Sequence, residues 1–112
     1  MLKVTRNPEF TTTARVLQPA DGGQTEGQFK IRFRAKTLSE RAAYDLNTPE
    51  GTDAFFRDVI IGWSELMDED GAAFEFSPAN LNLLLDLAPF RMAFTHAYFD
   101  ATSGIKAAKR GN

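Results

Sequence analysis

The residues of this chain best suited to chemistry form an acidic turn, Asp68-Glu69-Asp70-Gly71. Closely spaced carboxylates followed by glycine are typical of a calcium-binding EF-hand loop. When Gly71 is set at the sixth position of such a loop, the twelfth position falls on Ser77. The bidentate glutamate that closes the calcium shell is therefore missing. We interpret the segment as a solvated turn between two structural elements.

Other catalytic and metal-binding arrangements find little support in the sequence. The chain has no cysteine and one histidine, His96, which excludes thiolate zinc sites. Its neighbours Phe94, Ala97 and Tyr98 predict a partly buried helical residue with a structural role. The pair at 22–23 is Gly-Gly, without the Lys and Ser/Thr of a phosphate loop. We expect no catalytic residue, no metal and no cofactor, and hence no enzyme.

Four cations alternate with apolar residues in one segment. Side chains of a strand point to opposite faces in turn, so this alternation predicts a half-buried strand with a basic face. The cations are Lys30, Arg32, Arg34 and Lys36. This face has three possible roles: a charged edge that blocks random strand pairing, a docking face for an acidic protein, or a nucleic-acid surface.

The elements that position these residues predict an α+β fold. β-branched residues at about 10–17 and the basic strand at about 28–36 indicate an antiparallel hairpin, joined by a long Gly-rich loop at 18–27. Residues 2–5 are a candidate third strand. Four helices are expected to follow, at about 38–46, 49–66, 78–87 and 89–102. Residues 1–104 form one domain, and 105–112 form a flexible basic tail.

Helix start signals fix most of these boundaries. Thr37 and Glu40 have the spacing of a capping box. Thr48 and Ser77 each precede a proline, which is tolerated in the first turn of a helix. Pro89 restarts the last helix. The helices supply the apolar cover that a hairpin needs, because an isolated hairpin is only marginally stable in water.

Large apolar side chains are numerous for a chain of 112 residues, which includes ten phenylalanines. Most of them should fill the core, and those left over should form a surface that binds a partner. The residues selected for packing or partner contact are Phe55, Val59, Trp63, Phe94 and Tyr98.

Charge is segregated along the chain. Residues 1–41 hold eight Lys or Arg against four acids, and residues 42–104 hold eleven acids against two arginines. Opposed charge of this kind has two interpretations: head-to-tail self-association, or an ordinary soluble surface of mixed charge. The sequence has no apolar stretch long enough to span a membrane and no signal-peptide core at its start.

The C-terminal half resembles the small tail assembly chaperones of long-tailed bacteriophages and prophages. The resemblance lies in the order of several short motifs rather than in any one of them. The matching residues are Gly62-Trp63, 68–71, 74–78, Asn80-Leu81, 83–87 and 97–99.

The resemblance implies a non-enzymatic protein of tail morphogenesis. Such proteins coat the tape measure protein, recruit tail tube subunits, act in the cytoplasm of the bacterial host and are absent from the mature virion. Many family members also have a longer form made by frameshifting. Two alternatives stay open: a small structural component of the tail, such as a connector or terminator, and a nucleic-acid-binding regulator that uses the basic strand.

Overall fold

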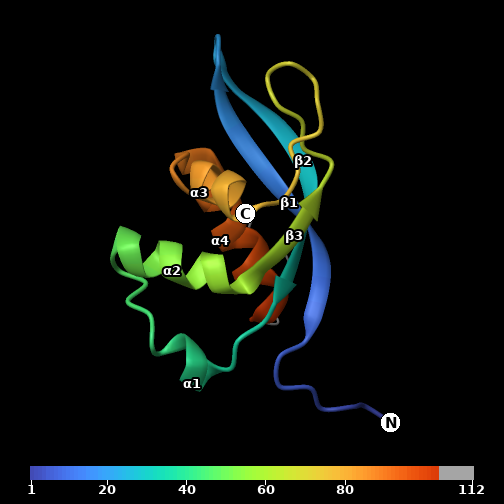
Figure 1. Ribbon diagram of the computed structural model, residues 1–112, viewed down its shortest axis with the longest axis vertical. Helices are drawn as coiled ribbons and strands as arrows, with labels where there is room; N and C mark the ends of the chain where they lie inside the picture. Colours follow the sequence, from blue (N-terminus) through green and yellow to red (C-terminus); the bar gives the residue numbers. More distant parts are fainter. Residues whose placement is uncertain (104–112) are drawn as a thin grey trace.

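The computed structural model describes residues 1–103 and has the predicted α+β fold (Figure 1). A hairpin of two strands is joined by a third strand in an antiparallel sheet of order β1-β2-β3. Four helices in this part of the chain complete the fold. The elements are β1 (Glu9–Ala20), β2 (Gly23–Arg34), α1 (Leu38–Arg41), α2 (Pro49–Val59), β3 (Ile60–Ser64), α3 (Pro78–Leu85) and α4 (Ala88–Thr102).

The hairpin is longer than the sequence predicted. Both strands have 12 residues, and they pair continuously from Glu9 with Arg34 to Ala20 with Gly23. The long loop expected at 18–27 is therefore wrong: Asp21 and Gly22 alone connect the strands. Gly22 has φ +81°, which a residue without Cβ adopts at little cost. The Gly-rich, polar composition of this segment predicted a loop, although the same residue types also permit a tight two-residue turn.

The third strand comes from an unexpected segment. Residues 2–5 form no strand, so that prediction is wrong. The helix expected at 49–66 ends at Val59, and the next five residues pair with β2. The run of Val59, Ile60 and Ile61 favours the extended conformation because β-branched side chains are stiff in a helix. Pairing with the free edge of β2 then satisfies the backbone groups.

The helix starts agree with the predicted caps. Thr37 and Glu40 form the complete capping box of α1, while the side chains of Thr48 and Ser77 accept backbone bonds at the starts of α2 and α3. The helix predicted at 38–46 is nevertheless shorter and ends at Arg41. The predicted flexible tail at 105–112 lies outside the described residues.

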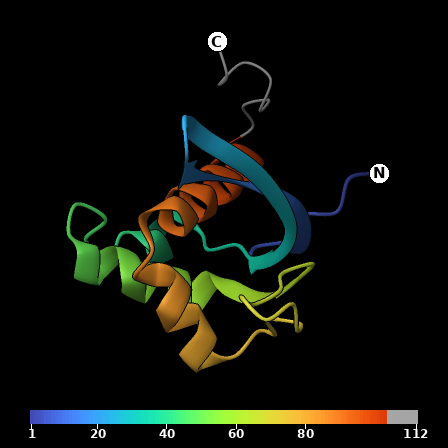
Figure 2. The ribbon, with the colours of Figure 1, turned by 90° about the horizontal axis from the view of Figure 1, so that it is seen from above.

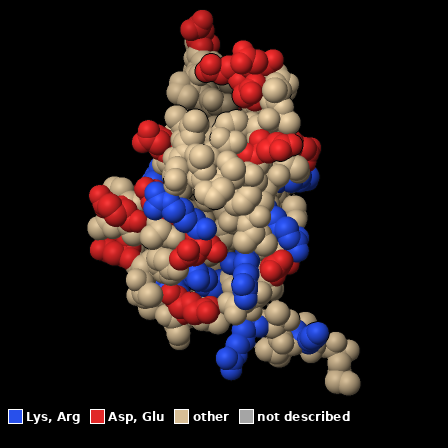
Figure 3. Space-filling view, viewed as in Figure 1, with Lys and Arg blue, Asp and Glu red and all other residues tan. Residues whose placement is uncertain are grey.

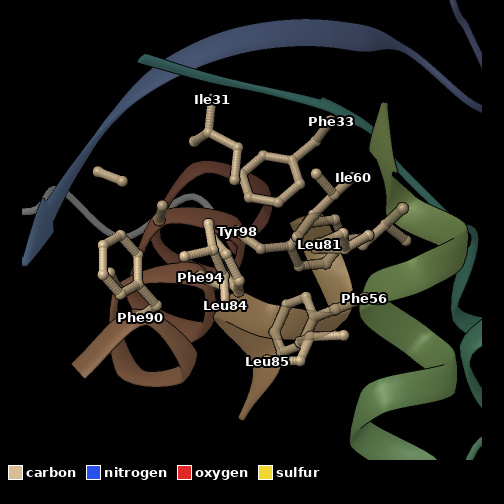
Figure 4. Close-up of a cluster of buried hydrophobic side chains, with 14 of the residues drawn as sticks. Ile31, Phe33, Phe56, Ile60, Leu81, Leu84, Leu85, Phe90, Phe94 and Tyr98 are labelled. Carbon is tan, nitrogen blue, oxygen red and sulfur yellow. The ribbon is translucent and has the colours of Figure 1, made fainter. Parts of the chain in front are cut away.

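The core lies between the inner face of the sheet and the helices. The hairpin curves over α4 (Figure 2), and apolar side chains of β2 point towards α4 (Figure 4). Phe33 and Tyr98 meet edge to face with their centroids 5.2 Å apart, and Phe29 packs on Phe94 at 6.4 Å. Such aromatic pairs add to the stabilisation from burial. Within residues 1–103, no helix is both long enough and apolar enough to cross a bilayer.

Candidate partner-binding groove

Trp63 fixes the long connection between β3 and α3. Its indole N–H donates a hydrogen bond of 2.7 Å to the carbonyl oxygen of Phe74. Its ring stacks on Phe74 at 6.0 Å and meets Phe76 edge to face at 5.0 Å. Met67 and Ala73 pair across the same connection. The connection is therefore packed against the core, and its residues have defined positions.

The acidic turn lies at the outer end of this connection. The carboxylate of Asp68 accepts hydrogen bonds from the backbone N–H groups of Asp70 and Ala72, at 2.9 and 3.0 Å. These bonds close a turn, as the sequence interpretation proposed. Among the described residues no three His, Asp or Glu side chains are grouped to hold a metal ion. His96 is exposed on α4, so the expectation of partial burial was wrong.

A groove lies between this connection and the α3–α4 corner, with β1 at one end. Its volume is about 480 Å³. We call it the Met67 groove. Its lining residues are Gln18, Leu66, Met67, Asp68, Glu69, Asp70, Phe74, Leu83, Leu84, Leu87 and Phe90.

Large apolar side chains on the walls of the Met67 groove are open to solvent. Met67 is 72% exposed, Leu83 52% and Leu87 42%. Exposed apolar residues that gather around one hollow, with a charged rim, mark a site for another molecule. The rim here is anionic, since Asp68, Glu69 and Asp70 lie on it. The chemistry of the groove therefore suits an apolar segment that carries positive charge.

A second hollow, of about 780 Å³, lies on the other side of the same leucines. It is lined by both Leu83 and Leu87, and the polar residues of its other walls are Asp53, Arg57, Asn82, Asp86 and Arg91. Arg91 forms an ion pair with Asp53 there, and Arg57 donates a hydrogen bond of 2.7 Å to Asn82. Both arginines already have protein partners, so their charged groups are less available to bind another molecule than the carboxylates of the Met67 groove.

The basic strand has the alternation that the sequence predicted. Lys30, Arg32 and Arg34 lie on the outer face of β2, while the residues between them are buried. Lys30 and Arg32 donate hydrogen bonds to Thr13 and Thr11 of β1, at 2.7 and 3.0 Å. Arg15 extends the positive row on the same face, because it pairs with Gln28. We call Arg15, Lys30, Arg32 and Arg34 the basic face.

Lys36, the fourth predicted cation, lies beyond the end of β2. Its ammonium group sits 5.6 Å from the centre of the Tyr44 ring. Its backbone N–H donates a hydrogen bond of 3.0 Å to the hydroxyl of Tyr98. Lys36 therefore joins the sheet to the helices and is not part of the basic face.

Four of the five apolar residues selected from the sequence are core residues. Phe55, Val59, Phe94 and Tyr98 are all at most 2% exposed, which is the packing role. Trp63 is partly buried and holds the wall of the Met67 groove. It contributes to the candidate site by positioning other residues.

Sequence reasoning missed the exposed residues of the groove. The segment 81–87 reads Leu-Asn-Leu-Leu-Leu-Asp-Leu, which places leucines on more than one face of a helix. A helix that packs on one side needs a narrower apolar stripe. The excess of leucine was the available signal, and it identifies Leu83 and Leu87.

One end of the surface is acidic, while the rest carries charges of both signs (Figure 3). The end that carries the hairpin turn and the acidic turn shows acidic side chains without basic ones on the face in Figure 3, whereas Lys and Arg lie further down. The acids of this end include Asp21 in the hairpin turn and the three carboxylates of the groove rim.

Two ionisable side chains near α1 are perturbed. Hydrogen bonds from the backbone of Thr37 and the side chain of Asn7 lower the pKa of Glu40. The hydrogen bond that Tyr44 donates to Asp58 raises the pKa of Tyr44 to about 12. Both residues tie the α1 region to other elements, and neither lies in the groove.

Comparison with protein-family models, with curated proteins and with solved structures gives no match for this chain.

Proposed function

We propose that this protein is a tail assembly chaperone of a bacteriophage or prophage. It binds the tape measure protein during tail morphogenesis and brings tail tube subunits to it. It acts in the cytoplasm of the bacterial host, catalyses no reaction and is absent from the mature virion. The motif order in residues 62–99 and the chemistry of the Met67 groove support this proposal.

The observation that carries the proposal is the exposed apolar lining of the groove. Long apolar helices need cover before they are packed into a larger assembly. A groove with apolar walls receives such a helix through side chains at every third or fourth position. Met67, Leu83 and Leu87 line the groove and are open to solvent.

The size of the groove indicates a weak complex. Each large apolar side chain contributes about 1.5–3 kcal/mol when it is fully buried. Association itself costs about 4–15 kcal/mol in lost motion. A few such side chains therefore give a short-lived complex. This property suits a helper that must release its client as the tail tube forms.

Co-expression with a helical fragment of the tape measure protein from the same phage genome tests the proposal. The wild-type chain should keep the fragment soluble. Leu83→Asp should abolish this effect by placing a charge in the groove. Met92→Asp is the matched control, because Met92 is equally exposed, at 55%, and does not line either hollow.

Two results would contradict the proposal, and a third would contradict the role of the groove in it. If the fragment stays insoluble when it is co-expressed with the wild-type chain, the tape measure protein is not the client. Stoichiometric amounts of the protein in purified virions favour a structural tail component instead. If Leu83→Asp solubilises the fragment as well as the wild type does, then the groove is not the binding surface.

A nucleic-acid-binding regulator is the second candidate, because Lys30, Arg32 and Arg34 lie on one face of β2, where Arg32 also pairs with Glu9 at 3.7 Å. Cations at alternate positions of a strand lie about 6.6 Å apart and can follow a phosphate backbone. Affinity that falls steeply with salt would support this candidate. Absence of binding at low salt would exclude it.

A further inference from the structure

We propose that Asp21 is the site of a spontaneous covalent modification, in which its peptide link to Gly22 isomerises to an isoaspartyl link. The chain has two Asp-Gly steps, Asp21-Gly22 and Asp70-Gly71. Both lie in exposed turns, and the fold protects only the second of them. The inference concerns the chemistry of the chain itself, so it does not depend on the client that the protein binds.

The reaction at an Asp-Gly step is intramolecular. The backbone nitrogen of the glycine attacks the carboxyl carbon of the aspartate side chain and forms a C–N bond. The hydroxyl of the carboxyl group leaves as water, together with the proton of the attacking nitrogen. Water then opens the resulting succinimide ring at either carbonyl carbon. Opening on the α-carbonyl side leaves the backbone running through the side chain, and the net change is an isomerisation without gain or loss of atoms.

The glycine nitrogen of the hairpin turn is free to react. Asp21 and Gly22 connect β1 to β2, and the pairing of Ala20 with Gly23 closes the turn. Within residues 1–103, no hydrogen bond of a turn involves the backbone N–H of Gly22. A Cβ placed on Gly22 would meet nothing within 4 Å. Both the succinimide ring and the water that opens it therefore have room.

The glycine nitrogen of the acidic turn is held in place. The N–H of Gly71 donates a hydrogen bond of 3.0 Å to the carbonyl oxygen of Asp68. The N–H of Asp70 donates one of 2.9 Å to the carboxylate of Asp68. These bonds fix the peptide groups on both sides of Asp70 and must break before the nitrogen can attack.

The two glycines are otherwise closely alike. Gly22 has φ +81° and Gly71 has φ +85°, which glycine adopts at little cost. A Cβ on either would meet nothing within 4 Å. The hydrogen bonds of the acidic turn are therefore the difference that decides which step reacts.

An isoaspartyl link in the hairpin turn changes the hairpin end and leaves the core intact. It adds one methylene carbon to the backbone of a two-residue turn, and turn length fixes the pairing register of a hairpin. Every residue from 17 to 28 is exposed, whereas the buried residues of the two strands begin at Val16 and Phe29. This end of the hairpin extends beyond the helices (Figure 1). The modified chain should therefore keep its fold, with a frayed hairpin end.

Ageing of the purified full-length chain at neutral pH in heavy-oxygen water tests the inference. Each ring opening adds one heavy oxygen atom to the aspartate, and mass spectrometry after digestion in ordinary water detects it. Trypsin places the two steps in different peptides, residues 16–30 and 58–91. Uptake should be at least about threefold faster in 16–30, which is the effect of one hydrogen bond that must break in the other turn.

Short synthetic peptides of residues 18–24 and 67–73 are the matched control. Each places an Asp-Gly step at its centre and lacks the tertiary fold. Their rates of uptake should be similar to each other and to the rate at Asp21 in the folded chain. The slow rate at Asp70 in the folded chain then belongs to the structure and not to the neighbouring sequence.

Two variants of the full chain separate the causes. Asp21→Glu keeps the charge but lengthens the side chain, so it should abolish uptake in the hairpin peptide. Asp68→Ala removes the carboxylate that holds the acidic turn, and uptake at Asp70 should rise towards the rate at Asp21. In the aged wild-type chain, amide hydrogen exchange should become faster in 17–28, while the midpoint of thermal unfolding stays unchanged.

Three results would overturn the inference. The first is equal uptake at the two steps of the folded chain, or faster uptake at Asp70. The second is uptake at Asp21 that is much slower in the folded chain than in its short peptide, because the hairpin turn would then protect it. The third is an unchanged rate at Asp70 in Asp68→Ala when circular dichroism shows that this variant is folded.

Discussion

Trp63 and Phe74 hold each other by two contacts at once: a hydrogen bond of 2.7 Å from the indole to the carbonyl oxygen and a ring stack at 6.0 Å. They lie 11 positions apart, at the two ends of the connection that carries the acidic turn. This pair converts a polar loop into a wall of the Met67 groove. Its loss should therefore affect the groove before it affects the sheet.

Substitutions at Trp63 should separate these two contacts. Trp63→Phe keeps an aromatic ring but loses the hydrogen bond, which should lower the free energy of unfolding by about 0.5–1.5 kcal/mol. Trp63→Ala also removes the packing, and its cost should approach the lower end of the range of about 3–5 kcal/mol for buried aromatics. Urea unfolding followed by far-UV circular dichroism measures both. Equal costs for the two variants would show that the ring contributes nothing.

Gly51→Ala should destabilise the protein, although alanine is normally the better helix residue. A Cβ at Gly51 would lie 2.0 Å from the carbonyl oxygen of Asp45. The obstacle is backbone, so α2 or the preceding turn must move, at a cost of about 1–3 kcal/mol. Gly62→Ala is the control, because its Cβ meets nothing within 4 Å. In thermal unfolding, the midpoint temperature of Gly51→Ala should be clearly lower than that of Gly62→Ala.

Tyr44 should make stability fall at alkaline pH. The hydrogen bond to Asp58 raises its pKa from 10.0 to about 12 in the folded protein. The neutral phenol is therefore favoured by folding. This contribution is fully present below pH 10 and is lost as the pH rises towards 12. Tyr44→Phe should show a smaller loss of stability across this interval in urea unfolding, and an identical loss would contradict the assignment.

A charge introduced at two neighbouring leucines of α3 should have very different effects on the free energy of unfolding. Leu83 is 52% exposed, so Leu83→Asp should change the free energy of unfolding by no more than about 0.5 kcal/mol. Leu84 is 4% exposed, so Leu84→Asp should cost at least about 3 kcal/mol or unfold the protein. Thermal unfolding of both variants checks this contrast. A large loss for Leu83→Asp would mean that its effect on binding comes from misfolding.

The sequence alone determined the local features. Caps at Thr37, Thr48 and Ser77 fixed three helix starts, because a cap involves only residues within one turn. The alternation around Lys30 fixed the strand, its buried side and its exposed side. These features are short-range, so periodicity and side-chain chemistry were sufficient to predict them.

Tertiary structure decided where the chain changes from helix to strand. An apolar stripe through Phe55, Val59 and Trp63 fits a helix of continuous length, and the free edge of β2 competes for the same residues. The strand forms because β2 supplies hydrogen-bond partners for the backbone N–H and C=O groups of this segment. A short run of β-branched residues is also unfavourable in a helix. Strand formation at 60–64 places Trp63 against Phe74. The Met67 groove depends on this placement and on residues of segments far apart in the sequence, so the sequence alone did not predict it.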